Sequence, residues 1–365
     1  MNKTNTLLVA LIVIVLLIGC SKAITNIKED EPFNSGLGFD ESTDAICSQS
    51  DNKILISGNF NNYNGVPASK MVRLNLDGSI DKSFTARTFN GDVRNMQVQS
   101  DGKIMVCGNF TTYNNVTAGK LIRLNPDGSL DNSFYAYDGD IFPKTFLTFS
   151  DEVIYILVQK DNKILAVASS VSEGSRLVRF NTDGTLDKTF GSNGVILTNG
   201  DIGSLYQNNS GTIYLGGNFT EANGIPCNGL LKLSKDAIID MQFAFNIPIS
   251  FISTICDDGN GGAIIGGDFG LIKVSTNGTT STLVSNVNIK KALYYAGNIL
   301  YFNTSGQIVK IDAANGNVDS EFHNVVQSSN NVNSGIILNN KLFITGSFTY
   351  LNNKISNRIA CLNLQ

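Results

Sequence analysis

The sequence contains few of the residue patterns that are typical of catalytic or metal sites, and the most regular pattern of reactive side chains is an aspartate before a glycine. The sequence contains one histidine, His323, and six cysteines. A single histidine rules out a metal site built from several histidines. A serine-histidine-aspartate triad needs only one, but neither a G-x-S-x-G turn nor a phosphate-binding glycine loop is present. We therefore expect no catalytic residue, no metal and no cofactor.

Aspartate-glycine pairs recur along the chain, and three of them are followed, four residues after the aspartate, by a second aspartate. The two sets are Asp77, Asp127 and Asp183, and Asp81, Asp131 and Asp187. Calcium requires six to eight oxygen ligands, and this spacing matches no loop that supplies them. Aspartate before glycine is typical of tight turns, where the carboxylate accepts hydrogen bonds from its own backbone. We interpret these aspartates as turn residues, while carboxylate pairs formed only by folding leave glycoside hydrolysis open.

The N-terminal segment has the features of an export signal. Lys3 supplies positive charge, and Leu7 to Ile18 form an apolar run of twelve residues, whereas a membrane-spanning helix needs about 20. We interpret residues 1–19 as a signal peptide. The run ends in "LIGC", Leu17 to Cys20, which resembles the bacterial lipoprotein box. That resemblance implies an exported lipoprotein, anchored by a lipid on Cys20 at the outer membrane or cell surface, with residues 20–29 as lipidated N-terminus and tether.

The remaining cysteines do not form a recognisable redox or metal pattern. They are Cys47, Cys107, Cys227, Cys256 and Cys361. An odd number of cysteines cannot all pair, and no two of them have C-x-x-C spacing. We interpret them as small apolar residues that fill space in the core.

Composition and charge argue against a nucleic-acid partner. Charged residues make up 16% of the chain and the formal net charge is −4, whereas soluble domains contain about 25% charged residues. A protein that binds phosphate backbones presents a basic surface, which this composition does not provide. The surface must instead be covered largely by Asn, Ser, Thr and Gly.

A repeated pattern indicates how the chain is organised. Segments similar to "DGKIMVCGNF", which begins at Asp101, occur seven times, and they begin at Asp51, Asp101, Asp161, Ser210, Asn260, Ala296 and Asn339. Successive starts differ by 50, 60, 49, 50, 36 and 43 residues. This period is typical of propeller blades.

A second pattern completes the repeating unit. "RLNPDGSLDNSF", Arg123 to Phe134, has near copies that begin at Arg73 and Arg179. Within this unit the pattern predicts four antiparallel strands, at Val93–Gln99, Lys103–Val106, Lys120–Asn125 and Leu130–Phe134. The pattern ends in an aromatic residue that we expect to pack as a wedge between neighbouring sheets. These wedge positions are Phe84, Phe134, Phe190, Phe243 and Phe322, with Val284 in the fifth unit.

Together, "DGKIMVCGNF", "YNGVP" and "RLNPDGSLDNSF" resemble the delta-60 repeat of bacterial β-propellers. The resemblance implies an all-β fold, often at the cell surface, but it implies no agreed activity. With seven units we predict a seven-bladed β-propeller of four-stranded antiparallel blades over residues 30–365. Unit seven ends without its last strand, whereas "DEPF", Asp30 to Phe33, aligns with "DKSF", Asp81 to Phe84. We therefore predict that an N-terminal strand closes the ring.

Long loops between the second and third strands are the strongest candidates for a binding surface. They occur in units one, two, four and seven, and each has Asn before Gly or Asn: Asn64, Asn114, Asn223 and Asn352. Such asparagines are typical of turns with left-handed backbone. The alternative is a ligand surface made from these amides and from tyrosines expected to be exposed. Those tyrosines are Tyr63, Tyr113 and Tyr350, with Tyr135 and Tyr137 in an insertion of unit three.

These patterns lead to one expected function and two alternatives. The expectation is a lipid-anchored, non-catalytic binding module for a glycan or an envelope protein, with the membrane as a further partner through the lipid. The first alternative is a polysaccharide-active enzyme, a hydrolase or lyase, with carboxylates on the long-loop face. The second is a structural spacer in the envelope.

Overall fold

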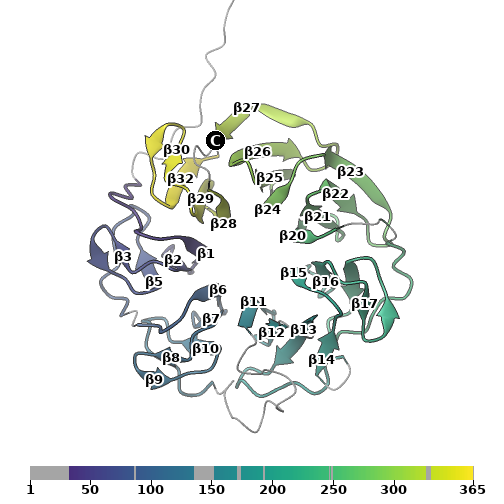
Figure 1. Cartoon of the computed structure of the whole chain (residues 1–365), viewed down its shortest axis with the longest axis horizontal. Coiled ribbons are helices and arrows are strands. Elements are labelled where there is room, and N and C mark those ends of the chain that lie inside the picture. The colour runs from purple at the N-terminus through teal and green to yellow at the C-terminus, as the bar shows by residue number, and fades with distance from the viewer. Residues whose placement is uncertain are drawn as a thin grey trace, which may run out of the picture.

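All regular structure in the described part of the chain is antiparallel β-sheet (Figure 1). The computed structural model describes residues 33–85, 88–134, 152–170, 174–191, 194–245, 247, 250–325 and 330–364. This part of the chain contains no apolar helix long enough to cross a membrane. The predicted signal peptide, Cys20 and the predicted tether lie outside the described residues.

Seven sheets of three or four strands follow one another along the chain, and we number them one to seven. Sheet one has β1 (Thr43–Ser48), β2 (Ile54–Gly58) and β5 (Met71–Leu74), and sheet two has β6 (Val93–Val98), β7 (Ile104–Gly108) and β10 (Leu121–Leu124). Sheet three has β11 (Glu152–Val158), β12 (Ile164–Ser170), β13 (Gly174–Phe180) and β14 (Val195–Leu197). Sheet four has β15 (Ile202–Gln207), β16 (Ile213–Gly217) and β19 (Leu230–Leu233).

The last three sheets continue the series. Sheet five has β20 (Ile252–Asp257), β21 (Ala263–Gly267), β22 (Gly270–Val274) and β23 (Thr280–Ser285). Sheet six has β24 (Ile289–Tyr295), β25 (Asn298–Asn303), β26 (Gln307–Asp312) and β27 (Val318–Val325), which contains His323. Sheet seven has β28 (Val332–Leu338), β29 (Lys341–Gly346) and β32 (Ile359–Asn363).

Four short hairpins project from the sheets, each between the second and third strands of its sheet. They are β3 (Asn62–Tyr63) with β4 (Val66–Pro67), β8 (Thr112–Tyr113) with β9 (Val116–Thr117), β17 (Glu221–Ala222) with β18 (Ile225–Pro226), and β30 (Tyr350–Leu351) with β31 (Lys354–Ile355). They correspond to the long loops of units one, two, four and seven. Figure 1 shows them toward the outside of the molecule.

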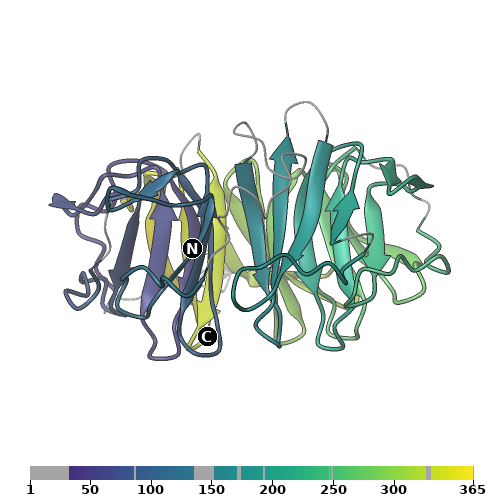
Figure 2. The same cartoon turned by 90° about the horizontal axis from the view of Figure 1, so that it is seen from below.

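The second strand of each sheet is buried on both faces because each sheet packs against its neighbours. In β2, β7, β16 and β21 every residue is buried. The aliphatic sequence of Lys103–Val106 predicted such a strand, and β7 confirms it. The first strands β1, β6, β11, β15, β20, β24 and β28 lie nearest a common centre, as Figure 1 shows, and Figure 2 shows the sheets edge-on.

The hydrophobic core is divided into clusters that lie between neighbouring sheets. One cluster joins Met71 of sheet one to Val106 of sheet two, with Phe84 between them. The wedge prediction is confirmed in four units, where Phe84, Phe134, Phe190 and Phe322 are buried. In unit four the predicted Phe243 is only partly buried, and Phe245 is the more deeply buried of the two rings.

A further cluster joins the first sheet to the last. It contains Ile46 and Ile56 of sheet one together with Phe343 and Cys361 of sheet seven, and Phe33 packs against it. Hydrogen bonds link the same two sheets. Thr43 Oγ1 donates to the carbonyl of Gly346 at 3.0 Å. The two ends of the described chain therefore pack side by side.

The predicted fourth strand is only partly confirmed. Sheets three, five and six have four strands, but sheets one, two and four have three. There the predicted strand is reduced to a single bridge, as between Leu124 and Leu130. The chain turns directly afterwards because Asp131 Oδ1 accepts hydrogen bonds from the backbone nitrogen and Oγ of Ser133. In sheet three the fourth strand is β14, which lies beyond the predicted segment.

Candidate functional site

The asparagines of the four hairpins are turn residues, as one of the two interpretations predicted. Each hairpin turn has two residues with positive φ: Asn64 and Gly65, Asn114 and Asn115, Asn223 and Gly224, and Asn352 and Asn353. Two-residue hairpins favour this mirror-image turn because its twist matches that of the strands. The amides also bind their own chain. Asn64 Oδ1 accepts from the nitrogen of Gly38 at 3.0 Å, and Asn223 Oδ1 accepts from that of Leu197 at 2.8 Å.

The expectation that Tyr63 and Tyr113 are exposed is wrong. Their exposed fractions are 0% and 2%. The Tyr63 hydroxyl donates to the carbonyl of Gly78 at 2.7 Å, and its ring packs on Phe39 with centroids 4.6 Å apart. The Tyr113 hydroxyl donates in the same way to the carbonyl of Gly128. A residue with no exposed surface cannot contact a ligand, so these tyrosines are part of the core.

The other predicted tyrosines have different outcomes. Tyr350 is 45% exposed because it lies one position earlier in its hairpin than Tyr63 does in its own. The position equivalent to Tyr63 is Leu351 in unit seven and Ala222 in unit four, and both are buried. That shared apolar character was the signal in the sequence that the position faces inward. Tyr135 and Tyr137 lie outside the described residues.

The aspartates before glycine cap their own turns, as predicted. Asp77 Oδ1 accepts hydrogen bonds from the backbone nitrogen and the Oγ of Ser79, at 2.9 and 2.7 Å. These hydrogen bonds lower the pKa of Asp77. Asp127 and Asp183 are bound in the same way. In the described part of the chain, no group of three or more His, Cys, Asp or Glu side chains is placed to hold a metal ion.

The second set of aspartates takes part in an inter-sheet contact that we call the latch. In the latch between sheets one and two, Arg73 Nε donates to Asp81 at 2.8 Å. The guanidinium lies 4.7 Å from the centre of the Phe84 ring. Its Nη1 donates to the carbonyl of Pro126, in the turn of the next unit, at 2.6 Å. Burial alone would raise the pKa of Asp81, but hydrogen bonds from Ser83 and the charge of Arg73 outweigh it and lower the pKa to about 2.

The latch recurs and explains most of the repeated sequence. Arg123 and Arg179 occupy the place of Arg73, with Asp131 and Asp187 as partners. Their Nη1 atoms donate to the carbonyls of Thr182 and Lys235. In unit four Lys232 replaces the arginine and reaches the carbonyl of Thr276 at 2.7 Å. The charged residues of the motif therefore join sheets, and we assign them no ligand.

The strongest candidate site is a set of side chains around the common centre. The first strand of every sheet has a β-bulge near its start, after its first or second paired residue. We call the seven extra residues the axial ring: Asp44, Arg94, Ile154, Gly203, Ser253, Lys290 and Asn333. The first strands lie nearest the centre (Figure 1), and each bulge lies near the start of its strand, so we infer that these residues gather at one end of the central region. Contacts between neighbouring sheets agree, because Arg94 lies 3.6 Å from Asp44 and Asn333 Nδ2 donates to the carbonyl of Thr43 at 3.0 Å. Bulges often re-aim side chains beside functional sites.

Arg94 links three of the units at this end of the molecule. Its Nε donates to Glu152 at 2.5 Å, and its guanidinium lies 3.6 Å from Asp44 and 3.5 Å from Asp92. Burial raises the pKa of Asp44, Arg94 opposes that shift, and Asp92 and Glu152 add to it. Across the ring, burial lowers the pKa of Lys290, and the charge of Asp44 opposes that change. The axial ring thus combines both charges in a partly desolvated setting.

An aromatic ring adds to this surface. A Cβ atom on Gly203 would lie 2.4 Å from the ring of Phe251 and 2.4 Å from the carbonyl of Ile252. Glycine at position 203 is therefore what allows the half-buried Phe251 to lie against the start of β15. A partly exposed aromatic ring can stack on a sugar or an apolar side chain, and the polar members of the axial ring can hydrogen-bond to polar groups of a ligand.

Sequence reasoning did not find the axial ring. Its residues come from seven distant segments and match no motif. The available signal was a comparison of the units with each other. The bulged position varies from unit to unit, whereas the preceding residue is buried in every one: Thr43, Val93, Val153, Ile202, Ile252, Ile289 and Val332.

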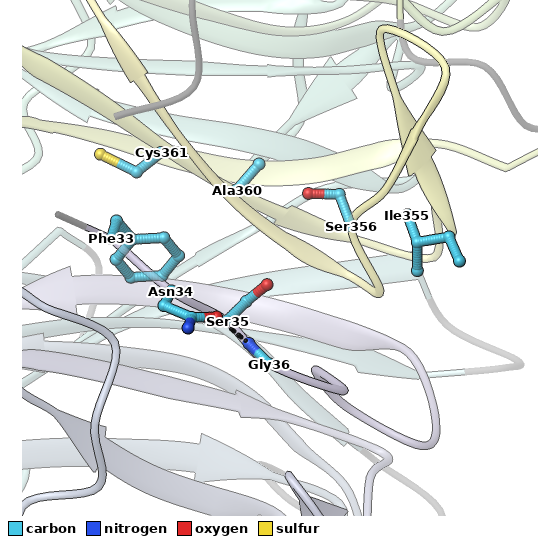
Figure 3. Close-up of a pocket in the computed structure, with 8 residues that line it drawn as sticks. All are labelled: Phe33, Asn34, Ser35, Gly36, Ile355, Ser356, Ala360 and Cys361. Carbon is cyan, nitrogen blue, oxygen red and sulfur yellow. Dashed lines mark hydrogen bonds between the residues drawn. The ribbon is translucent and has the colours of Figure 1, made fainter. Parts of the chain in front are cut away.

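A cavity of about 150 Å³ lies at the seam between sheets one and seven (Figure 3). It is lined by Phe33, Asn34, Ser35 and Gly36 on one side and by Ile355, Ser356, Ala360 and Cys361 on the other. Asn34 donates to the carbonyl of Asp77 at 2.9 Å, just as Thr85 does to that of Asp127. Cys361, however, occupies the position that Arg73 has in sheet one, so this seam lacks the latch cation.

Comparisons with known proteins agree with the fold. Four segments match a family described as a domain of unknown function (DUF5122) beta-propeller, at residues 49–84, 99–134, 159–190 and 209–243. The chain therefore carries repeats of a β-propeller type. No curated protein matches the sequence significantly.

Solved structures with the same fold include two bacterial extracellular domains. One belongs to a protein described as the hybrid two component system BT3049 of B. thetaiotaomicron, with 13% identity and a TM-score of 0.54. The other belongs to the one component system BT4673 of the same organism, with 11% identity and a TM-score of 0.53. The match covers 89% of this chain and 40% of each of those chains. The computationally designed Ika8 protein also matches, with a TM-score of 0.54, 11% identity and coverage of 89% and 97%.

Proposed function

We propose that the protein is a lipid-anchored β-propeller of the bacterial envelope that binds a glycan or a protein without altering it chemically. The propeller is of the delta-60 type, and a lipid on Cys20 holds it at the outer membrane or cell surface. The lipoprotein-like sequence "LIGC" supports the anchor. The extracellular position of the two structural neighbours named above supports export.

We further propose that the seven sheets are the blades of a closed ring. Phe33 supports this closure, because its ring packs edge-on against Phe343 with centroids 5.6 Å apart, in the wedge position of the last seam. Arg358 Nη1 also donates to the carbonyl of Phe39 at 2.6 Å. The predicted closing strand, Asp30 to Phe33, lies outside the described residues except for Phe33, so strand pairing with sheet seven remains part of the proposal.

The axial ring is the proposed binding site. The observation that supports this proposal is that the bulged residue differs from unit to unit, although the bulge and the buried residue before it occur in every unit. All seven units keep the buried residue before the bulge, while the bulged residue is acidic, basic, apolar, small or an amide. A packing requirement would favour similar residues in every unit. Different side chains around one centre instead form an asymmetric surface that can select a particular ligand.

A second candidate function is cleavage of a polysaccharide. The raised pKa of Asp44 favours it, because burial shifts the pKa of this carboxyl in the direction that a general acid requires. Glu152 and Asp92 supply further carboxylates, but both interact with Arg94. The shared arginine favours binding over catalysis. The spacer alternative has no such observation in its favour.

The test is a glycan array and an envelope pull-down with the purified full-length protein in detergent. We expect capture to fall at least about tenfold, equivalent to about 1.4 kcal/mol, in Arg94→Gln and Phe251→Leu variants. Asp77→Asn and Asp127→Asn are matched controls in exposed turns and should retain capture. Loss in the controls alone would move the site away from the centre. Release of new reducing or unsaturated sugar ends by the wild type, lost in Asp44→Asn, would favour the enzyme instead.

A further inference from the structure

An exposed apolar surface lies at the outer edge of the seam between sheets one and seven. Its members are Leu37, Ile355, Val66 and Tyr350, with exposed fractions of 73%, 68%, 49% and 45%. We call this surface the seam rim. A monomeric protein rarely gathers large apolar side chains on its surface without a partner that covers them.

Hydrogen bonds and strand pairing connect these residues, which come from distant parts of the sequence. The carbonyl of Leu37 accepts a hydrogen bond from Asn357 Nδ2 at 2.8 Å, two residues after Ile355. Ile355 pairs with Tyr350 across the hairpin β30–β31. On the other side of Leu37, Gly38 donates to Asn64 in the hairpin that carries Val66. Gly36 and Ile355 face each other across the seam cavity (Figure 3).

We propose that the seam rim rests on the membrane to which the protein is anchored. The first described residue, Phe33, lies at this same seam (Figure 3). Thirteen positions separate Phe33 from Cys20, a stretch that spans at most about 45 Å when extended. A lipid on Cys20 therefore holds this edge of the molecule near the bilayer at a high effective concentration. The inference rests on the lipid anchor of the proposed function.

The chemistry of the rim suits the interface between lipid headgroups and acyl chains. Leucine, isoleucine and valine gain free energy when their exposed surface leaves water. Tyrosine favours this interface because its ring is apolar and its hydroxyl stays hydrated. Lys354, exposed beside Ile355, places a positive charge where headgroup phosphates lie. The lipid on Cys20, together with a weak contact between the seam rim and the bilayer, would hold the protein in a fixed orientation.

The absence of tryptophan from the sequence makes this testable with single inserted probes. The full-length acylated protein is reconstituted into phosphatidylethanolamine–phosphatidylglycerol vesicles, and lipid attachment is first verified by mass spectrometry. Ile355→Trp and Leu37→Trp place probes in the rim. Ile238→Trp is the matched control, because Ile238 is 71% exposed and lies in unit four, across the molecule. Thermal unfolding verifies that each variant folds.

We expect vesicles to shift the emission of both rim variants to shorter wavelengths. We also expect lipids brominated on the acyl chain to quench the rim variants at least about twice as strongly as the Ile238→Trp control. Equal quenching of rim and control in a protein that carries its lipid overturns the rim proposal and leaves the anchor intact. A protein without lipid overturns both. A blue shift that needs no vesicles and grows with protein concentration also overturns it, because a second copy then covers the rim.

Discussion

Arg73 Nη1 donates a 2.6 Å hydrogen bond to the carbonyl of Pro126, and this bond ties sheet one to the turn of the next unit. The same relationship joins Arg123 to Thr182 and Arg179 to Lys235. Each guanidinium also stacks on a wedge phenylalanine and pairs with an aspartate, so one buried cation satisfies three neighbours. The stability of the molecule should depend strongly on these latches.

Replacing Arg123 by Met should lower the free energy of unfolding by about 3 kcal/mol. The change leaves Asp131 buried beside Lys103 alone, and removing one partner of a buried ion pair is strongly destabilising. Urea denaturation measures the effect. The exposed Lys188 provides the control, because Lys188→Met should change stability by no more than about 0.5 kcal/mol. Equal stability of both variants would show that the latch adds nothing.

Asp81 should make stability depend on pH at the acidic end. Its pKa is about 2 in the folded protein and 3.8 ordinarily. A lowered pKa stabilises the fold above pH 4, and this contribution disappears as the pH falls through 4 toward 2. The stability difference between the wild type and Asp81→Asn should therefore be full at pH 7 and shrink toward pH 2. A difference that stays constant over this range would contradict the ion pair.

Asp44 should have the opposite effect on stability, because its ionised form should destabilise the fold. Burial raises its pKa, so the ionised carboxylate opposes folding at neutral pH. Asp44→Asn should raise the melting temperature at pH 7, and the gain should vanish as the pH falls toward the ordinary pKa of 3.8. Calorimetry at several pH values measures this. A lower melting temperature at pH 7 would mean that the attraction of Arg94 exceeds the burial effect.

Phe33→Ala should destabilise the seam between the first and last sheets by about 2 kcal/mol. Phe33 packs on Phe343 but is only partly buried, so its loss should cost less than that of a fully buried phenylalanine. The buried wedge Phe84 offers the comparison, and Phe84→Ala should cost about 3 to 5 kcal/mol. If removing Phe33 has no effect on denaturation, the N-terminal segment does not close the ring.

Cys20→Ser should abolish lipid attachment and release the protein from membranes, because the thioether to the diacylglycerol can no longer form. Metabolic labelling with a fatty acid, followed by fractionation, measures both outcomes. Ser21→Ala, directly after the cysteine, is the control and should stay labelled. Label that persists on the Cys20→Ser protein would rule out the lipoprotein interpretation.

Much of the fold could be predicted because the repeat constrains each unit in the same way. Aliphatic runs such as Ile104 to Val106 must be buried on both faces, and Asn-Gly pairs require turns with positive φ. The wedge phenylalanines were found because they recur at a fixed place. A property shared by all units is visible in the sequence even where one copy is degenerate.

Two predictions were wrong, the exposure of Tyr63 and the full fourth strand of unit two, because both depend on the local geometry of the chain within a unit. The exposure of Tyr63 depends on its exact position in the hairpin, because neighbouring positions face in opposite directions. Tyr350 lies one position earlier in its own hairpin and is exposed. The fourth strand fails after Leu130 because Asp131 turns the chain to reach Arg123. No motif within a single unit predicts the contacts of the axial ring or the carbonyl acceptors of the latch, because these contacts join residues from different units.

The seam between sheets one and seven has Cys361 in place of the latch arginine, and this difference has a mechanical consequence. When load is applied to a chain anchored near its N-terminus, the first described contacts to carry it are those of Phe33 and Asn34, namely the packing of Phe33 on Phe343 and the Asn34–Asp77 hydrogen bond. The Arg73 latch of the next seam lies further along the path of the force. Pulling should therefore separate Phe33 and Asn34 from the first and last sheets before it breaks the latches, so that the seam between these two sheets yields first and the other seams stay intact.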